Sequence, residues 1–361
     1  MERHGAGQTT VDVGPRESLA RSTSTGGGAV YTARVEPSTG EEARDQALPR
    51  AVAIVGPTAS GKSRVGLELA ARLELPILCC DSVQVYRGLD IGSAKPTAED
   101  RARAPHHLLD LVDPDEDFSA GDYGRGAHAL LRELAAPGLF VGGTGFYLRA
   151  ALMSQSGAQA GADPKRLDPE RAAFTDTWEQ RERATPGSVH AALARVDPET
   201  ARAIHPRNVV RAVRALWLCR VHGRPVSAVR REDPPRRQLS LLMIVLDPGV
   251  AKVDAAIERR CDAMLAAGWI AEVEKLVAAG YDARHKAMRS LGYRQLVEHL
   301  AGRLSLEDAV KAIKAETRRY ARRQRTYLRH QLEAETTMTI HIESARDLPW
   351  EQVAEFVGGA A

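Results

Sequence analysis

Gly56-Pro57-Thr58-Ala59-Ser60-Gly61-Lys62-Ser63 is the stretch that decides the fold of this 361-residue chain. It has the spacing G-x-x-x-x-G-K-[ST] of a phosphate loop, follows the apolar run 51–55 and precedes a predicted helix over 65–73. In such a loop, backbone N–H groups at the helix N-terminus surround a diphosphate, Lys62 neutralises its charge and the Ser63 hydroxyl can bind Mg²⁺. The strand and helix on either side argue against a chance match, so the sequence predicts a phosphorylated ligand.

Short apolar runs alternate with helical patterns from residue 50 onward. The candidate strands are 51–55, 76–80, 108–112, 139–141 and 241–246. Continuous apolar strands alternating with helices are typical of a parallel sheet that is covered on both faces. We therefore predict an α/β fold, with a helical region from 247 to 335 and a further short strand at 337–342.

The composition is that of a globular protein with two parts. Hydrophobic residues make up 43% of the chain, charged residues 27%, and the net charge is +3, so a nucleic-acid surface must be a local patch. The sequence has no long apolar run typical of a membrane span and no apolar signal-peptide core. Cys79 and Cys80 lie in an apolar strand and are expected to be buried thiols, which suits a cytoplasmic protein.

The chain divides into three segments by composition. Residues 1–48 contain few large apolar side chains and are predicted to be a disordered extension, whose acidic residues argue against an organellar transit peptide. Residues 154–235 contain no candidate strand and are rich in Arg and Ala, which predicts a helical insertion domain. The α/β core then comprises 49–153 and 236–346.

Two sites lie at the predicted carboxyl edge of the sheet, where ligands bind in open parallel sheets. Asp81 directly follows the second strand and could be a Mg²⁺ ligand, a general base or the cap of the next helix. A glycine-rich turn at 141–145 carries Thr144, and its glycines would let the backbone approach a ligand closely. A tight strand-to-helix turn needs the same residues.

Basic residues gather in three places, at 207–214, at Arg259-Arg260 and most densely at 318–330. Within 318–330, arginines alternate with tyrosines that can stack on bases, and no acidic residue interrupts them. This pattern favours an RNA surface over the alternative of a solvated helix face.

Taken together, these segments resemble the tRNA dimethylallyltransferase family. The matching segments are GPTASGKS (56–63), DSVQVYRGLDIGSAKP (81–96), PHHLLD (105–110), FSAGDY (118–123), VGGTGFYLRAAL (141–152), IHPRNVVRAVRAL (204–216), MRSLGYRQL (288–296) and RRQRTYLR (322–329). They occur in family order over nearly all of 51–331. The resemblance implies a P-loop NTPase-like parallel sheet core with a mostly helical insertion domain and tRNA-binding C-terminal helices.

The resemblance further implies that the loop binds dimethylallyl diphosphate rather than ATP, with Mg²⁺ as the cofactor and Ser63 as its protein ligand. The implied acceptor is the N6 amine of the adenosine on the 3′ side of the anticodon (tRNA position 37). Asp81 would take the proton of the attacking amine, Arg260 would stabilise the leaving diphosphate, and Thr144 would lie near the reacting centre. The implied diphosphate-binding residues are Gly56, Pro57, Thr58, Ala59, Ser60, Gly61, Lys62 and Ser63.

The implied macromolecular partner is the tRNA anticodon stem-loop, whose target base must leave its stack to reach Asp81. The contact positions carried over from the family are Asp81, Ser82, Val83, Gln84, Thr144, Arg171, Val210, Arg211, Ala212, Val213, Arg214, Met288, Arg289, Ser290, Leu291, Gly292, Tyr293, Arg322, Arg323, Gln324, Arg325, Thr326, Tyr327, Leu328 and Arg329. Arg171 is preferred over Arg166 for the arginine of the insertion domain. No membrane partner is expected, and the chain is expected to act as a monomer.

Three other functions are compatible with parts of the sequence. The phosphate loop alone would allow a small-molecule kinase or ATPase, but the arginine-tyrosine segment would then have no role. A prenyltransferase acting on free adenine nucleotides would not need the helical RNA-binding apparatus. A non-catalytic RNA-binding protein would not need Lys62, Ser63 and Asp81 together.

Overall fold

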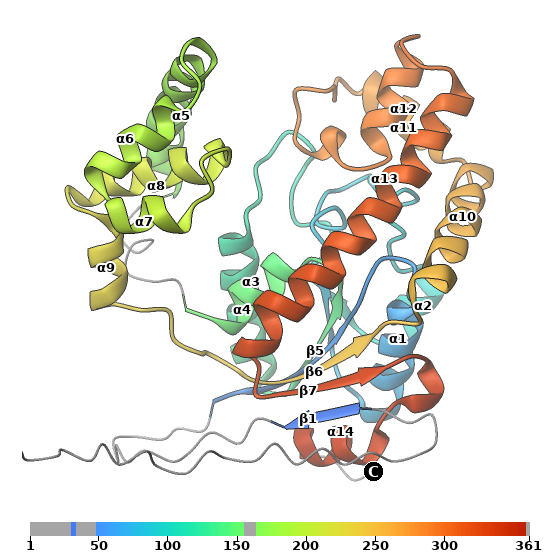
Figure 1. Ribbon diagram of the computed structural model, residues 1–361. Coiled ribbons are helices and arrows are strands. Elements are labelled where there is room, and N and C mark those ends of the chain that lie inside the picture. The colour runs from blue at the N-terminus through green and yellow to red at the C-terminus, as the bar shows by residue number, and fades with distance from the viewer. Residues whose placement is uncertain (1–29, 34–47, 155–163, 359–361) are drawn as a thin grey trace, which may run out of the picture.

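The computed structural model describes residues 30–33, 48–154 and 164–358, and its centre is a seven-stranded sheet of order β1-β7-β6-β2-β5-β3-β4 (Figure 1). The strands are β1 (Val30–Ala33), β2 (Arg50–Val55), β3 (Ile77–Cys80), β4 (His106–His107), β5 (Gly138–Gly142), β6 (Ser240–Leu246) and β7 (Met338–Ile342). Neighbouring strands are parallel except for β1, which pairs antiparallel with β7. The predicted α/β class with a parallel sheet core is confirmed.

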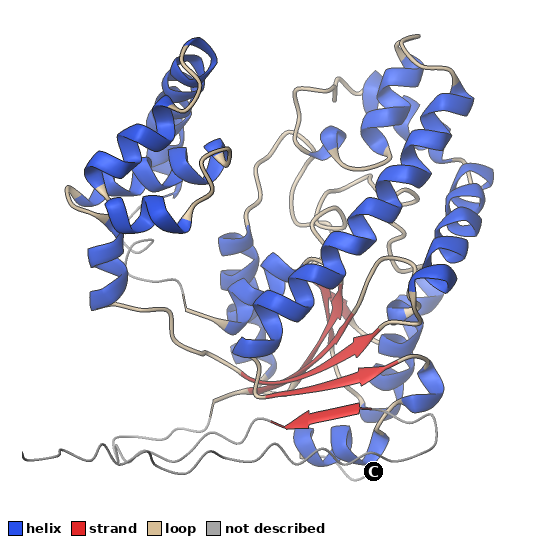
Figure 2. Cartoon of the chain, viewed as in Figure 1, coloured by secondary structure: helices blue, strands red, loops and turns tan. Residues whose placement is uncertain are grey.

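Helices cover both faces of this sheet (Figure 2). Side chains alternate between the two faces along each strand. On β2, Val52 and Ile54 point to the face covered by α1 (Lys62–Leu73) and α14 (Trp350–Val357). The alternate residues of β2 point to the other face, where α3 (Ala120–Leu134), α4 (Gly145–Leu152) and α13 (Leu306–Tyr327) contribute to the core. Burial of both faces explains why the central strands are continuous apolar runs.

The insertion is helical throughout its described part, as the sequence predicts. It consists of α5 (Pro164–Ala184), α6 (Ser188–Val196), α7 (Pro198–Ala203), α8 (Val209–His222) and α9 (Val226–Glu232). Helices α5 to α8 share a small apolar core around Leu193 and Leu216, and α9 packs against the end of α8 through Val226 and Val229. The Asp197 carboxylate, which is fully buried, accepts hydrogen bonds from the backbone N–H groups of Thr200 and Ser227 and so ties α7 to α9.

The C-terminal part is helical up to β7, which confirms the prediction for 247–335. It consists of α10 (Val250–Ala266), α11 (Trp269–Ala278), η2 (Ala287–Arg289), α12 (Tyr293–Leu300), α13, η3 (Leu328–Leu332) and η4 (Glu333–Glu335). A short turn, η5 (Ala345–Asp347), then leads from β7 to α14, and α2 (Ala98–Arg103) lies between β3 and β4. Figure 1 shows α13 running across the sheet, beside its carboxyl edge.

The predicted strand at 108–112 is wrong. The strand at this place is β4, which ends at His107, and the next residues adopt left-handed backbone with φ of 62° at Leu108 and 53° at Asp110. An extended strand cannot contain such residues. The Asp110 carboxylate instead forms an ion pair of 2.5 Å with the buried Lys95 ammonium, so this segment is a loop that an ion pair stabilises.

Four residues of the predicted disordered extension 1–48 instead form a strand, β1 (Val30–Ala33), which extends the edge of the sheet. The rest of that prediction, 1–29 and 34–47, falls outside the described residues.

Candidate functional site

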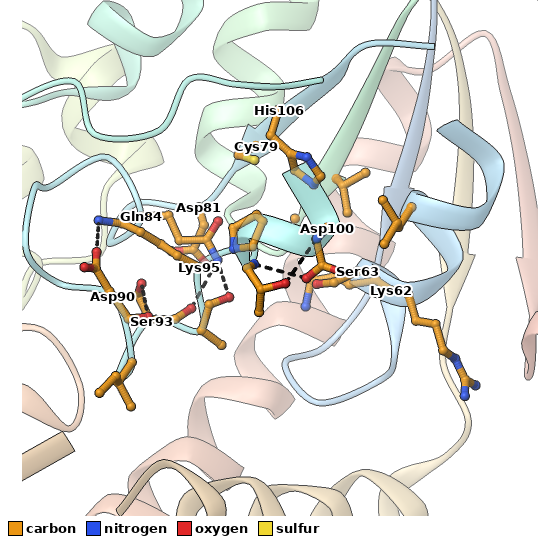
Figure 3. A pocket seen from close by; sticks show the side chains of 18 of the residues that line it. Lys62, Ser63, Cys79, Asp81, Gln84, Asp90, Ser93, Lys95, Asp100 and His106 are labelled. Atoms are coloured by element: carbon orange, nitrogen blue, oxygen red, sulfur yellow. Dashed lines mark hydrogen bonds and ion pairs between the residues drawn. The ribbon is translucent and has the colours of Figure 1, made fainter. Parts of the chain in front are cut away.

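A pocket of about 1360 Å³ lies at the carboxyl edge of the sheet (Figure 3). The phosphate loop, the segment that follows β3, the end of β5, α10 and α13 all contribute to its wall. In Figure 3, Lys62 and Ser63 lie on one side of the pocket, and Gln84, Asp90 and Lys95 lie on the other. The structure therefore brings the sequence-predicted phosphate and acceptor residues to one cavity.

The predicted phosphate loop lies between β2 and α1, as its motif requires. Gly61 has a φ of 92°, which lets the chain turn so that α1 begins at Lys62. The Ser63 side chain is exposed at this helix N-terminus, whereas the Ser60 hydroxyl is buried and has no hydrogen-bond partner among the described residues. Backbone N–H groups at a helix start, together with unused hydroxyls, form a site suited to an anion.

Lys62 and Arg260 are cations of the pocket that lack a carboxylate partner among the described residues. Lys62, which is 9% exposed, donates to the Pro57 carbonyl at 3.3 Å, and Arg260 Nη1 donates to Thr58 Oγ1 at 3.4 Å. Burial lowers the pKa of Lys62 to about 8, and the charge of Arg260 acts in the same direction. Burial also lowers the pKa of Arg260. Within 48–154 and 164–358 neither group forms an ion pair, so the pocket is electrostatically prepared for a ligand with negative charge.

Asp81 follows β3 and also faces the pocket. Its Oδ1 accepts the Val83 N–H at 2.9 Å and orders a turn; the helix cap considered from the sequence is not what this carboxylate forms, because the next helix, α2, begins at Ala98 and is capped by Thr97. Its Oδ2 accepts no hydrogen bond within the described ranges. The negative charge of Asp81 raises the pKa of both Lys62 and Arg260, against the larger effect of burial. One oxygen thus orders the turn and the other stays available for chemistry.

Thr144 lies beside Asp81, at the end of β5. Its Oγ1 accepts the Ser82 N–H at 3.1 Å, and its own N–H donates to the Cys80 carbonyl at 3.2 Å. Tyr320 of α13 lines the same pocket. Burial and then the charge of Asp81 raise the pKa of Tyr320 to about 12, while the Thr144 hydroxyl acts in the opposite direction. The phenol is therefore neutral at physiological pH.

The glycines of the turn at 141–145 make room for other parts of the protein, which supports the second of the two explanations given from the sequence. A Cβ on Gly142 would lie 2.0 Å from the Cys80 carbonyl oxygen. A Cβ on Gly143 would lie 2.2 Å from Gln324 Nε2, and one on Gly145 would lie 2.3 Å from Tyr327 Cδ1. The turn is small because β3 and α13 pack directly against it.

The basic segment of α13 is partly neutralised by acids that are distant in the sequence. Arg318 pairs with Glu258 of α10, and Arg325 forms two bonds, of 2.6 and 2.7 Å, with the Asp247 carboxylate at the end of β6. The Arg322 guanidinium lies 3.6 Å from Asp254. The arginines of this segment that form no ion pair with any described residue are Arg319, Arg323 and Arg329. The RNA surface predicted over 318–330 is therefore narrower than the sequence suggests.

The other predicted tRNA contacts fall into two groups. Arg171, Val210, Arg211, Arg214, Arg289, Arg322, Arg323, Thr326 and Arg329 have exposed side chains, whereas Asp81, Ser82, Val83, Gln84, Thr144, Ser290, Leu291, Arg325 and Tyr327 are half-buried. Ala212, Val213, Met288, Gly292, Tyr293, Gln324 and Leu328 are buried. Tyr293, for example, donates its hydroxyl to Glu272 at 2.7 Å. The side chains of this last group lie below the surface, although Gln324 also lines the pocket, and contact of these residues with tRNA stays a prediction.

Sequence reasoning missed the residues that hold the wall of the pocket. Lys95 has a side chain that is 3% exposed, pairs with Asp90 and Asp110, and donates to the Tyr86 carbonyl at 2.6 Å. Glu272 of α11 accepts the N–H groups of residues 90–92. Tyr320 was predicted only to belong to the basic segment. Its spacing of four from Gln324 on one helix was the available signal that both face the same way.

The described ranges contain no group of three or more His, Cys, Asp or Glu side chains arranged to hold a metal ion. All four cysteines are buried free thiols, as expected for Cys79 and Cys80. Within the same ranges, none of the helices combines the length and the apolar character needed to cross a membrane.

Comparison with known proteins gives one consistent family. A family model described as IPP transferase matches residues 84–331, and one described as isopentenyl transferase matches 49–107. The tRNA dimethylallyltransferase of Pelotomaculum thermopropionicum is 40% identical over 282 residues, which cover 76% of this chain and 86% of the relative. The tRNA dimethylallyltransferase of Geobacter metallireducens is 42% identical over 297 residues, which cover 80% and 93%.

Solved structures show the same likeness. The tRNA isopentenylpyrophosphate transferase from Bacillus halodurans has 31% identity and a TM-score of 0.58, over 86% of this chain and 95% of that chain. A eukaryotic dimethylallyltransferase studied while acting on tRNA shares the fold, with a TM-score of 0.66 at 22% identity, over 80% and 71%.

Proposed function

This chain belongs to the tRNA dimethylallyltransferase family and prenylates tRNA, and from that premise we propose its donor, acceptor atom and catalytic groups. The donor is dimethylallyl diphosphate, bound at the phosphate loop. The acceptor is the N6 amine of the adenosine on the 3′ side of the anticodon. The products are N6-isopentenyladenosine in the tRNA and free diphosphate.

One observation supports this proposal most strongly. Lys62 and Arg260 face one cavity without a carboxylate partner among the described residues, and Asp81 lies in the same cavity with one oxygen free. A diphosphate would satisfy the two cations. The arrangement separates an anion-binding half from a half with a proton acceptor, as a displacement by a neutral amine requires.

The residues support a direct displacement. The N6 nitrogen forms a bond to C1 of the dimethylallyl group, the C1–O bond breaks, and the electron pair leaves with the diphosphate. Asp81 Oδ2 takes the amine proton, which matters because an amine conjugated with a purine ring is a weak nucleophile. Lys62, Arg260 and the loop N–H groups stabilise the charge that develops on the leaving oxygen.

The chain's residues fit Mg²⁺ held jointly with the donor. Magnesium prefers oxygen ligands and usually keeps waters and substrate phosphates around it instead of a cage made only of protein. Ser63 would supply a hydroxyl oxygen, since its side chain is exposed at the N-terminus of α1. When bound, the ion offsets negative charge on the leaving diphosphate.

The tRNA would lie against the exposed residues of α8 and α13, with its target base turned into the pocket. Exposed arginines on α8, on α13 and on η3, which follows α13, would contact phosphates; they are Arg211, Arg214, Arg323 and Arg329. Unstacking of the target base costs a few kcal/mol in a duplex and less in a loop, so an anticodon loop is a favourable substrate. The cytoplasmic location and the monomeric state stay predictions, and light scattering with and without tRNA tests the second.

The deciding experiment is nucleoside mass spectrometry of a tRNA transcript after incubation with the protein, Mg²⁺ and dimethylallyl diphosphate. We expect one adenosine beside the anticodon to gain the mass of the prenyl group. A parallel reaction with ATP and no prenyl donor tests the kinase or ATPase alternative, and it should release no phosphate. Phosphate release from ATP without tRNA modification would contradict the proposal.

A further inference from the structure

Gln324 is a buried residue of α13 that joins two parts of the pocket. Its side-chain carbonyl accepts the Thr58 N–H at 2.8 Å, and its amide NH₂ donates to the Gly143 carbonyl at 2.8 Å. The residue is 6% exposed. Thr58 belongs to the phosphate loop and Gly143 to the turn that carries Thr144. A single amide therefore connects the predicted donor side to the acceptor side.

Further hydrogen bonds extend from both partners of this amide, Thr58 and the turn that contains Gly143. Thr58 Oγ1 accepts from Arg260, a pocket cation that forms no ion pair with any described residue. On the other side, Gly143 precedes Thr144, whose hydroxyl accepts the N–H of Ser82, the neighbour of Asp81. Every polar link in this series is a hydrogen bond between parts of the chain that are distant in sequence.

The position of Gln324 is fixed independently of these bonds. The next residue, Arg325, holds α13 to the end of β6 through two bonds with Asp247. A Cβ on Gly143 would lie 2.2 Å from Gln324 Nε2, so the turn has no space for any other residue at this place. The amide is thus held by two hydrogen bonds, on a helix that the Arg325–Asp247 pair fixes to the end of β6.

We propose that Gln324 is a positioning residue for prenyl transfer, which sets the placement of the phosphate loop relative to Asp81. This inference rests on the proposed function above. It also replaces the role of direct tRNA contact that the sequence resemblance implied for Gln324. A base and a donor must meet within a fraction of an ångström of the reactive geometry, and an error of about 1 Å can cost about 100-fold in rate.

The first test is Gln324→Leu, which keeps most of the volume and removes both bonds. We expect kcat to fall about 100-fold and the KM for dimethylallyl diphosphate to rise, because the loop loses its fixed position. The affinity for tRNA should stay unchanged, since the side chain is buried. A variant with wild-type kcat and KM would overturn the proposal.

The matched control is Gln295→Leu. Gln295 is 3% exposed, and its amide likewise bonds two partners, the Gly292 N–H and Glu316. It does not line the pocket. Both variants should lose thermal stability because each leaves buried polar groups without partners. Only the Gln324 variant should lose kcat, and equal kinetic losses in both would show a merely structural role.

The second test is Gln324→Glu, which separates the two bonds by pH. An ionised carboxylate still accepts the Thr58 N–H but repels the Gly143 carbonyl, whereas a protonated carboxyl has an O–H that can donate to it. We expect the ratio of variant to wild-type kcat to rise as pH falls from 8 to 6, by up to about tenfold per pH unit. A ratio independent of pH would contradict the proposed role of the bond to the Gly143 carbonyl, even if the leucine variant failed to fold.

Failure of this inference can be distinguished from failure of the proposed function. If the wild-type protein does not prenylate tRNA from dimethylallyl diphosphate, the proposed function is wrong and these ratios are undefined. If the wild type is active while both Gln324 variants match it, only the positioning role is wrong.

Discussion

Lys62 and Arg260, the two cations of the pocket next to Asp81, differ from the paired cations of α13 in what neutralises them. Lys62 is buried and Arg260 is half-buried, neither forms an ion pair with a described residue, and both have a lowered pKa because burial disfavours their charge. On α13, Arg318 and Arg325 are paired with carboxylates of other elements. Unpaired charges of the first kind destabilise the ligand-free protein, whereas these charges of α13 are already neutralised by carboxylates of the same chain.

This difference distinguishes cations that are available to bind a ligand from cations whose ion pairs stabilise the fold. A buried unpaired cation destabilises the empty protein, so a bound anion stabilises that region. A paired surface cation gains little from a further partner. Counting arginines along the sequence does not make this distinction, but their partners in the structure do.

The largest effect should come from Asp81→Asn, which asks whether Asp81 mainly balances the pocket cations or accepts a proton. As a base, its loss should lower single-turnover prenylation by about 100- to 10,000-fold. The affinity for diphosphate should not weaken, because a repulsive charge is removed from the pocket. Calorimetry with inorganic diphosphate measures that affinity. Normal turnover would limit Asp81 to capping the turn at Val83.

The second-largest effect is expected from removing Lys62, a cation without an ion pair among the described residues. Lys62→Ala should lower kcat/KM for the donor by about 100- to 1,000-fold, since Lys62 stabilises charge on the leaving group. Lys314→Ala is the control, as it removes the same charge from a lysine already paired with Glu258 and Asp262. Equal losses in the two variants would abolish the distinction between the two regions.

A smaller effect is expected on tRNA binding. Arg323→Ala with Arg329→Ala removes two cations that form no ion pair with any described residue, and Lys314→Ala with Arg318→Ala removes two paired ones. The slope of log affinity against log salt concentration should fall by about one for each phosphate that the first double variant no longer binds. The second should keep the wild-type slope. Filter binding over a salt series measures both, and the reverse order would move the RNA surface to the paired side.

The smallest effect is a pH dependence. Lys62 has a pKa of about 8 in the free protein, so it is charged below pH 8 and progressively neutral above it. Donor affinity should therefore fall by about tenfold between pH 7 and pH 9, because only the protonated form neutralises the diphosphate. Lys62→Arg stays charged throughout this range and should remove the pH dependence. A wild-type affinity that is flat over this range would place Lys62 outside the donor site.

Local signals were sufficient for much of the fold. The motif at 56–63 is a strand, a loop and a helix, and the buried runs at 51–55 and 241–246 form central strands of the sheet. Each of these depends on residues adjacent in the chain. The run at 108–112 was also predicted to be a strand, but it contains Asp110, and its backbone is set by the Lys95–Asp110 pair, which no local pattern contains.

The site shows the same limit. Asp81, Thr144 and Lys62 were predicted to meet because the ends of parallel strands share an edge. The inward direction of Tyr320 and Gln324, and the neutralisation of Arg318 and Arg325, depend on how α13 packs against α10 and β6. These contacts join residues far apart in the sequence, so the basic segment was interpreted as one surface when it has several sides.

The bond between Thr58 and Gln324 spans 266 positions of the chain and has a consequence for synthesis. Domains tend to fold from the N-terminus as they leave the ribosome. The phosphate loop therefore emerges early, but it receives its partner only when α13 has been translated. In a nascent or truncated chain that stops before residue 324, the phosphate loop would lack its hydrogen bond to Gln324. The donor site and the RNA-facing helix are therefore completed in the same late step of synthesis.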